Sequence, residues 1–467
     1  MKPALEALRQ ELVEGRITRR EFVRRAVLLG FALPAAQALA GLSRVPSVFA
    51  QAAYQFGSYK SKPYAGKTIN VALVGEPRSD AVKRMLPEFA SKTGIKTNID
   101  ILPYPTLQEK QAVALTQKTG AYDVVHVDCV WVGQYAGQGW VVPATDFIKQ
   151  SDPKTLDIND FLPRVLSEQG SWEGVVYGLP FIQAVFGLHY RTDIFKKYGL
   201  KVPQTWEELR TTAKFLNEKE SKNGVYGLTI MGKRGVQLQC TWDNFLWSWG
   251  GDWYDKNYKP TINSPQAVES LVFMKSLLPY ALPGVLSYDW DENAQAFAQG
   301  KAAMNLQWQN AAPTFADPSK SKIVGKFYFE LIPGKKQPDG KIFRTPTFGG
   351  WGLMIPVDAK NKEAAWEWIV WATSKQMELE LAKAMPGSRR SSLSDVKLQK
   401  EHVEYKNMLR SLEFSKGRPR IAVYSEMADA IEVALSEALT GAKTPKAALD
   451  DANKRLEVIL RRGGFLK

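Results

Sequence analysis

Residues 68–74 read Thr-Ile-Asn-Val-Ala-Leu-Val, a β-branched apolar run that predicts a buried strand. Apolar residues then recur at helical spacing over 77–93. A second strand is predicted over 95–102, a second helix over 107–118 and a short third strand over 123–127. Strands that alternate with helices in this way predict a parallel, doubly wound α/β sheet.

The loops after the first and third strands hold candidate binding residues, because ligands of such sheets bind beyond the carboxyl ends of the strands. Glu76 directly follows the first strand, and Asp128 and Trp131 follow the third. A carboxylate accepts hydrogen bonds from hydroxyl groups more strongly than a neutral acceptor does, and an indole offers a flat apolar face. Asp128 equally suits a helix N-cap, so both roles stay open.

A second domain is predicted beyond residue 190. Residues 177–190 form an extended run with internal glycines, as expected for a crossing between two lobes. The stretch 193–310 is mostly helical by periodicity. The clearest further elements are helices over 206–217, 265–278, 294–300 and 361–374, a glycine-containing strand over 348–356 and a surface hairpin turn over 335–340.

Composition excludes several classes of protein. A chain of 467 residues with 45% hydrophobic and 24% charged residues is typical of folded, multidomain proteins rather than of disordered chains or proteins that span a membrane many times. The net charge is +14, and residues 51–467 keep 54 Lys and Arg against 44 Asp and Glu. This positive charge is spread along the chain, so we expect no nucleic-acid partner. We also expect a monomer.

The first 50 residues predict an export signal. Thr18-Arg19-Arg20-Glu21-Phe22-Val23 precedes a moderately apolar run over 26–42, and this order resembles a twin-arginine (Tat) leader. Cleavage is expected after Ala50 or, as the second choice, after Ala40. The resemblance implies export of a folded protein to the periplasm or the extracellular cell-wall space. Residues 51–66 show no clear period, so the fold is expected to begin near Lys67.

Few features of the sequence indicate an enzyme. The three histidines and the two cysteines, Cys129 and Cys240, have no metal-ligand spacing, and no phosphate-binding loop is present, so we expect no metal and no cofactor. Whether the two cysteines form a disulfide stays open. The enzyme alternative is a secreted glycoside hydrolase, for which Glu76 and Asp128 could serve as the paired carboxylates.

Six motifs, in a fixed order, resemble the extracellular solute-binding proteins of ABC importers, in the carbohydrate-binding group related to maltose-binding protein. The resemblance covers nearly all of the chain after the leader. The motifs are Tyr122–Asp128 with Trp131 and 136–143; Tyr177–Pro180 with Tyr190–Phe195; Pro203–Leu209; Phe297–Met304; Gly349–Trp351; and Asn361–Trp368.

The resemblance implies an α/β fold of two lobes, each with a mostly parallel sheet, that hinge shut on a solute and present it to a membrane permease. Lobe 1 is expected to comprise 67–182 and 348–385, and lobe 2 to comprise 183–347 and 386–467. Asp128 and Trp131 match a loop that contacts sugars, and Arg389 matches an arginine that faces the ligand or bridges the lobes. Gln307 replaces the glycine of the Gly-x-Trp pattern found in relatives.

The expected cleft combines aromatic faces with polar groups, because sugar rings stack on indoles and their hydroxyls need donors and acceptors. The candidate ligand-binding residues are Glu76, Asp128, Trp131, Gln183, Trp242, Asn305, Trp308, Gly350, Trp351 and Arg389. Their mixture favours a sugar, oligosaccharide or polyol, although Arg389 leaves anionic solutes such as sugar phosphates open. A soluble sensor that presents its ligand to a receptor is a further alternative with the same fold.

Overall fold

The computed structural model describes Glu11 and residues 54–466. The chain divides into two compact units, Met1–Tyr54 and Gln55–Lys467, and the second is described below. The predicted Tat leader and both cleavage sites lie outside the described residues. Among the described helices, none has both the length and the apolar character that crossing a membrane requires.

One eight-stranded sheet runs through the unit from Gln55 onward, in the order β2-β1-β3-β11-β6-β7, with β12 paired to β11 and β8 paired to β6. Two small antiparallel pairs lie outside this sheet. The strands of the large sheet are β1 (Thr68–Val74), β2 (Lys96–Leu102), β3 (Val124–Asp128), β6 (Gly178–Arg191), β7 (Met304–Trp308), β8 (Phe327–Glu330), β11 (Thr347–Met354) and β12 (Lys416–Gly417); the small pairs are β4 (Ser171–Trp172) with β5 (Val175–Val176) and β9 (Lys335–Lys336) with β10 (Ile342–Phe343).

The predicted parallel opening is confirmed. Strand β1 pairs in parallel with β2 and with β3, and the helices α4 (Pro77–Arg84), α5 (Leu86–Thr93) and α6 (Tyr104–Gln117) connect them. The single helix expected over 77–93 is wrong, because the structure has two helices that meet at Met85. Pro87, in the first turn of α5, has no backbone N–H to donate to the preceding turn, so the chain starts a new helix there.

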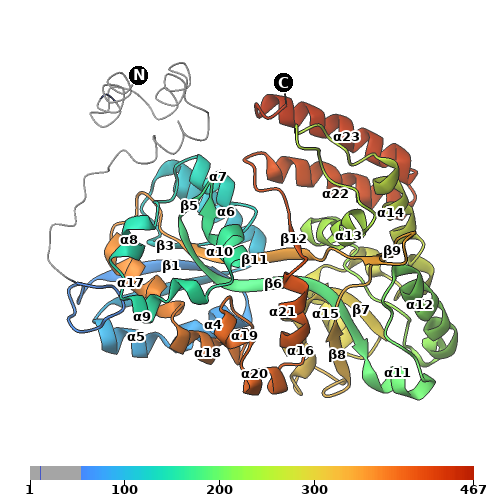
Figure 1. The fold of residues 1–467 in the computed structure, drawn as a ribbon, viewed down its shortest axis with the longest axis horizontal. Coiled ribbons are helices and arrows are strands. Elements are labelled where there is room, and N and C mark those ends of the chain that lie inside the picture. Colours follow the sequence, from blue (N-terminus) through green and yellow to red (C-terminus); the bar gives the residue numbers. More distant parts are fainter. Residues whose placement is uncertain (1–10, 12–53, 467) are drawn as a thin grey trace. The chain divides into compact units, whose positions relative to one another are not determined.

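Two long strands, β6 and β11, join the lobes (Figure 1). The first half of β6 pairs antiparallel with β11, and its second half pairs antiparallel with β7 and β8. The crossing predicted over 177–190 is therefore confirmed. The mostly parallel pairing expected for lobe 2 is wrong, because its strand pairs are antiparallel and the parallel contacts there are isolated bridges such as Thr229 to Asn305.

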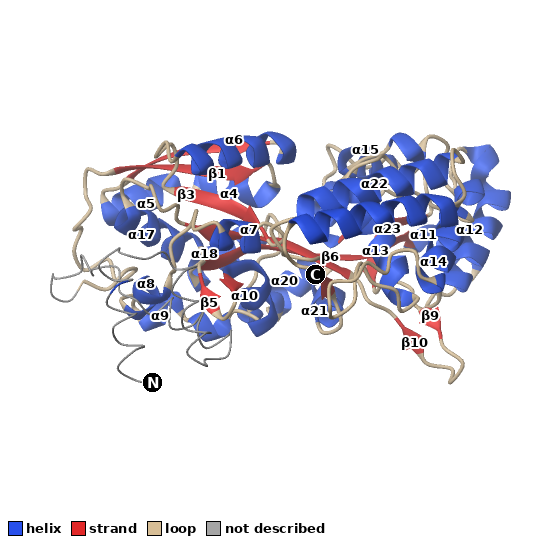
Figure 2. Ribbon diagram, turned by 90° about the horizontal axis from the view of Figure 1, so that it is seen from above, coloured by secondary structure: helices blue, strands red, loops and turns tan. Residues whose placement is uncertain are grey.

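Helices flank the sheet in each lobe (Figure 2). In lobe 1, α18 packs on α4, whereas in lobe 2 α13 packs on α14 and α22, and α22 packs on α23. The helices not yet given bounds are α7 (Val132–Gly137), α8 (Thr145–Lys149), α9 (Pro153–Leu156), α10 (Pro163–Gly170), α11 (Thr192–Tyr198), α12 (Trp206–Glu220), α13 (Val236–Ser248), α14 (Pro265–Lys275), α15 (Trp290–Ala298), α16 (Ala312–Ala316), α17 (Lys362–Ala372), α18 (Lys375–Ala382), α19 (Arg390–Leu393), α20 (Val396–Glu401), α21 (Tyr405–Leu412), α22 (Tyr424–Thr440) and α23 (Pro445–Arg462), with 3-10 turns η1 (Ile158–Asp160), η2 (Ser221–Asn223), η3 (Leu278–Tyr280), η4 (Val285–Ser287) and η5 (Gln309–Ala311).

The fold begins earlier than Lys67. Phe56 is buried, its ring stacks on Tyr64 and packs against Phe147, and its backbone bridges to Ser151. The next residue, Gly57, donates its N–H to the buried carboxylate of Glu367. Residues 51–66 show no clear period, and this concealed the contact, which includes the aromatic pair of Phe56 and Tyr64.

The contacts of residues 386–401 bear on the division into lobes. Arg389 donates hydrogen bonds to the carbonyl oxygens of Leu156, Asp157 and Thr373, and α19 packs on α18. Residues 389–393, which the sequence analysis assigns to lobe 2, therefore contact elements assigned to lobe 1. The remaining boundaries stay predictions.

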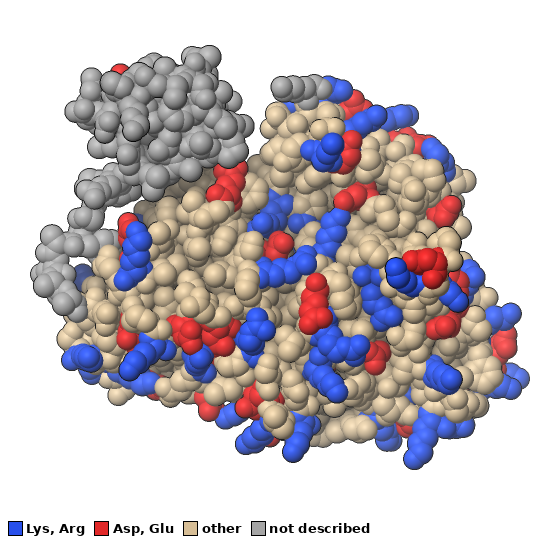
Figure 3. Space-filling model, in the orientation of Figure 1, with Lys and Arg blue, Asp and Glu red and all other residues tan. Residues whose placement is uncertain are grey.

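Lys and Arg side chains alternate with Asp and Glu over the face shown in Figure 3. This mixture agrees with the diffuse charge found along the sequence.

Candidate functional site

Asp128 ends strand β3 at the boundary between the lobes. Its backbone pairs with Trp351 of β11, and its side chain is buried. The Tyr104 hydroxyl donates to Oδ2 at 3.0 Å, and the Val130 N–H approaches Oδ1 at 3.4 Å. The short helix α7 has its N-cap at Trp131 without a side-chain hydrogen bond. Asp128 is therefore not the N-cap of α7.

Arg418 meets this carboxylate from the other side. It directly follows β12, and its Nη2 lies 3.4 Å from Asp128 Oδ1. Its Nη1 donates to the hydroxyl of Tyr424, the first residue of α22, at 3.1 Å. The Tyr424 hydroxyl in turn donates to Gln239 Oε1 on α13 at 3.0 Å. A buried polar chain therefore runs from Asp128 in lobe 1 to helices α13 and α22 in lobe 2.

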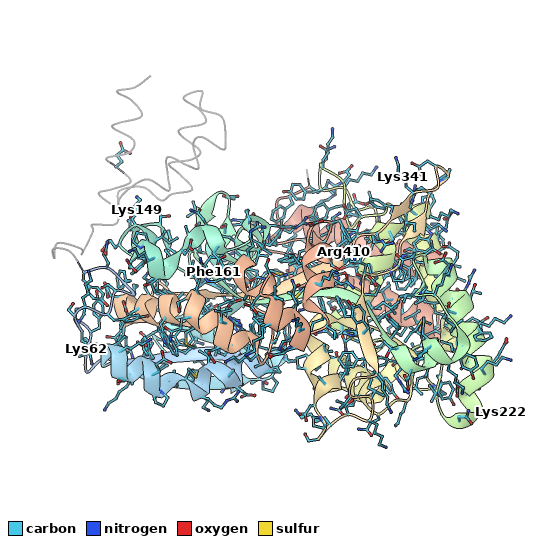
Figure 4. All side chains as sticks on the ribbon, turned by 60° about the horizontal axis from the view of Figure 1, so that its bottom comes forward. Lys62, Lys149, Phe161, Lys222, Lys341 and Arg410 are labelled. Carbon is cyan, nitrogen blue, oxygen red and sulfur yellow. The ribbon has the colours of Figure 1, made fainter. Side chains whose placement is uncertain are left out.

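Arg389 and Arg418, two of the buried arginines, differ in how fully they are hydrogen-bonded. Arg389 donates from Nε, Nη1 and Nη2 to carbonyl oxygens at 2.6, 2.9 and 2.7 Å, and its guanidinium lies over the ring of Phe161, which is labelled in Figure 4. Within the part of the chain that the structure describes, the buried Nε of Arg418 has no hydrogen-bond partner. Arg389 therefore ties loops of lobe 1 together, whereas Arg418 keeps a donor unused.

Glu76 makes a second contact between the lobes. It precedes α4, and Asn310 of η5 approaches both of its carboxylate oxygens at 3.4 Å. Burial, followed by the negative charge of Asp291, raises the pKa of Glu76 to about 8, although the Asn310 hydrogen bond lowers it. This carboxyl group is therefore largely protonated near neutral pH.

The aromatic candidates Trp131 and Trp351 pack against each other rather than standing free. Their ring centroids are 5.4 Å apart in an edge-to-face arrangement, and Tyr104 lies 5.2 Å from Trp131 and 5.5 Å from Trp351. Only 1% of Trp131 and 7% of Trp351 is exposed. This cluster holds Tyr104 and, through its hydroxyl, the Asp128 carboxylate in place.

Three candidates lie on the crossing strands or beside them: Gln183 on β6, Gly350 on β11 and Trp308 on β7, which pairs with β6. Trp308 donates from Nε1 to Gln237 Oε1 at 2.7 Å, and a Cβ at Gly349 would lie 2.9 Å from its ring. The Gln183 side chain accepts from Gln169 and donates to backbone carbonyls. Gly350 has φ +137°, and a Cβ there would lie 2.0 Å from Gln169 Nε2. These residues contribute to the packing of the crossing strands.

Two further candidates lie within lobe 2. Trp242 is fully buried and donates to Ser270 between α13 and α14. Asn305 of β7 is also buried; its oxygen accepts from Asn293 at 2.7 Å, while its Nδ2 has no partner among the described residues. The structure thus brings Glu76, Asp128, Trp131 and Trp351 to the facing edge of lobe 1 and leaves Trp242 and Arg389 inside their own lobes.

Both cysteines are buried free thiols. Cys129 follows Asp128, and its Sγ lies 4.0 Å from Arg418 Nη2. Burial raises the pKa of both thiols, so they stay protonated at neutral pH. Among the described residues, no group of histidine, cysteine and acidic side chains is arranged to hold a metal ion.

Two surface cavities lie away from these residues. One, of about 540 Å³, is lined by Tyr59, Lys92, Asp152 and Lys375 among others, and one of about 670 Å³ lies over α22 and α23. Neither brings together the predicted ligand-binding residues.

Sequence reasoning missed Arg418, Tyr424, Tyr104 and Asn310. The available signal was Gly417-Arg418-Pro419-Arg420, a short non-helical break between helical stretches. Arg389, after Pro386-Gly387-Ser388, showed the same kind of signal, and only the hydrogen bonds distinguish the two arginines.

Two lobes joined by crossing strands, with polar side chains meeting between them, define a binding protein of the periplasmic type. The family model for bacterial extracellular solute-binding proteins matches residues 75–378. The chain belongs to this family. Its members bind small molecules for ABC permeases and are located in the periplasm or outside the cell.

This chain is similar to several solute-binding proteins. An ABC transporter solute-binding protein from Agrobacterium radiobacter K84, solved in complex with ribitol, is 34% identical, with a TM-score of 0.79 over 85% of this chain and 100% of that one. A mannitol-binding protein of Pseudomonas aeruginosa is 26% identical over 71% of this chain and 76% of its own. A probable amino-acid ABC transporter periplasmic-binding protein of Sinorhizobium fredii is 24% identical over 87% of this chain and 92% of its own. These relatives are solute-binding proteins and not enzymes.

Proposed function

We propose that this protein captures a small polyol or sugar between its lobes and delivers it, as a monomer exported by the Tat pathway, to an ABC permease. The observation that carries the proposal is the buried contact between Asp128, at the end of β3, and Arg418, in the segment between β12 and α22, which have acceptor and donor capacity to spare. Glu76 and Asn310 add a second polar contact between the same lobes.

The relatives narrow the class of solute. The proteins described as binding ribitol, mannitol and erythritol or L-threitol favour a linear polyol. The protein described as a probable amino-acid binder makes an amino acid the competing ligand. An amino acid carries an ammonium and a carboxylate, so it would occupy the carboxylate and guanidinium as separate ion pairs.

Calorimetric titration of the exported protein tests this proposal. Ribitol, D-mannitol, erythritol, maltose and a neutral amino acid are titrated separately, and each compound is recovered and measured afterwards. We expect micromolar or tighter binding of at least one polyol, with the compound left intact. Binding of the amino acid alone would contradict the proposal, and consumption of any compound would favour the glycoside hydrolase.

Delivery is tested with the permease partner. Uptake of the bound polyol by cells that lack this protein is expected to fall to background and to recover when the gene is restored. Normal uptake together with loss of a transcriptional or chemotactic response would instead favour the ligand-presenting sensor.

A further inference from the structure

Asp128 and Arg418 form a pair of opposite charges whose bonds are incomplete. Their closest oxygen and nitrogen are 3.4 Å apart, whereas charge-assisted hydrogen bonds are usually about 2.7–2.9 Å long. Both side chains are about 95% buried, and the Arg418 Nε–H has no partner within the described chain. A buried donor of this kind is costly unless something else satisfies it.

The charges around the pair nearly balance. Tyr104 and Tyr424 approach it with neutral hydroxyl groups, and burial raises the pKa of both well above the ordinary value. The next arginine along the chain, Arg420, lies 3.3 Å from the carboxylate of Glu168. Asp243 of α13 accepts a hydrogen bond from Trp253, and burial raises its pKa to about 7. A solute at this place therefore meets one carboxylate and one guanidinium with little surplus charge.

This arrangement discriminates between solute classes. A hydroxyl group both donates and accepts, so neighbouring hydroxyls can donate to Asp128 and accept from Arg418 at once. An anionic solute is attracted by the Arg418 guanidinium but repelled by the Asp128 carboxylate. A cationic solute is attracted by Asp128 but repelled by Arg418. We propose, building on the function proposed above, that Asp128 and Arg418 together select neutral polyhydroxyl solutes and reject their carboxylate analogues.

The test compares ribitol with D-ribonate, which has the same five carbons and one carboxylate. We expect the wild-type protein to bind ribitol at least about 30-fold more tightly than ribonate, because like charges in a desolvated site repel strongly. In D128N this ratio is expected to fall by about 10-fold or more, since the repulsion is removed and Arg418 is freed. In R418Q ribitol binding is expected to weaken by about 10- to 100-fold, with no gain for ribonate.

Matched controls separate this effect from a general change of charge. Asp339→Asn removes a carboxylate from the exposed β9–β10 turn, and Arg234→Gln removes an exposed arginine; both are expected to leave the ribitol to ribonate ratio unchanged. Circular dichroism melting shows whether each variant folds. If D128N does not fold, the test uses the ratio of ribitol to ribonate affinity in the wild type and in R418K. R418K keeps the positive charge, so we expect it to keep this ratio.

The outcomes distinguish the two proposals. Binding of ribitol and ribonate with similar affinity by the wild-type protein, or an unchanged ratio in folded D128N, would overturn the selectivity pair and leave polyol capture intact. A wild-type protein that binds no polyol of the panel would overturn both.

Discussion

The guanidinium of Arg418 lies 3.4 Å from the carboxylate of Asp128, and this contact joins the end of β3 in lobe 1 to the segment that leads into α22 in lobe 2. Because Tyr424 and Gln239 continue the chain of hydrogen bonds, a shift of either lobe disturbs the whole network. Solute-binding proteins work by such relative motion of their lobes, since a bound solute favours the closed form.

The Glu76 carboxyl predicts a specific pH dependence of stability. Its pKa is about 8 in the folded protein against an ordinary value of 4.5. Between these values the folded protein holds a proton that the unfolded chain has lost, so the free energy of unfolding falls as the pH rises from about 4.5 to 8. In Glu76→Gln this fall is expected to be smaller by about 1–2 kcal/mol. The expected difference is no larger because the residue is half-buried, so that solvent screens part of the effect.

Urea denaturation at pH 5 and pH 8 measures this difference. The exposed Glu413→Gln serves as the control and should leave the pH dependence as in the wild type. An equal pH dependence in wild type and Glu76→Gln would show that this carboxyl is not protonated in the fold.

Arg389 is expected to be structural. Arg389→Gln removes a guanidinium that three carbonyl oxygens and the ring of Phe161 hold, so we expect a loss of about 3–5 kcal/mol of unfolding free energy. The neighbouring exposed Arg390→Gln should change it by less than about 0.5 kcal/mol. A stable Arg389→Gln protein that no longer binds solute would restore Arg389 as a ligand-binding residue.

The crossing strand β11 requires a glycine at position 350. A Cβ there would lie 2.4 Å from the Ile182 carbonyl oxygen, and its φ of +137° strains any other residue. Gly350→Ala is therefore expected to cost about 3 kcal/mol or more in thermal or urea denaturation. Gly137→Ala, in α7 with no atom near the added Cβ, should be neutral or slightly stabilising. Similar stability of both variants would refute the close approach.

Phe56 tests where the fold begins. Phe56→Ala is expected to lower the free energy of unfolding by about 3–5 kcal/mol, because the ring is 1% exposed and packs on Tyr64 and Phe147. The half-exposed Val113→Ala is the control and should cost less than about 0.5 kcal/mol. If Phe56→Ala is equally harmless, the Phe56 ring does not anchor the start of the fold.

Much of the architecture could be predicted because periodicity acts locally. The strand over 68–74 and the parallel β-α-β-α-β opening follow from β-branched runs and helical spacing, and they match the structure. The division of the helix at Met85 was not predicted, because the helical pattern continues through a proline that suits a first turn. The extended run over 177–190 predicted a crossing to a second lobe, and the family resemblance supplied the type of two-lobed fold.

The site was harder to predict because it depends on long-range partners. Asp128 could be chosen from its place after β3, but its partner Arg418 lies 290 residues further along the chain. Arg389 was proposed from the family resemblance and Arg418 was not considered, although both follow loop signals, and their hydrogen bonds differ. The tryptophans were chosen for their ring faces, yet Trp131 and Trp351 use those faces against Tyr104 and each other.

A crystal structure of the protein with the polyol that binds most tightly in the titrations tests the central claim most directly. We predict electron density for the polyol between the lobes, with its hydroxyl groups within hydrogen-bonding distance of Asp128 Oδ and Arg418 Nε or Nη. Density for the polyol elsewhere, such as in the cavity beside Lys92 and Lys375, with the Asp128 to Arg418 contact unchanged, would contradict the account.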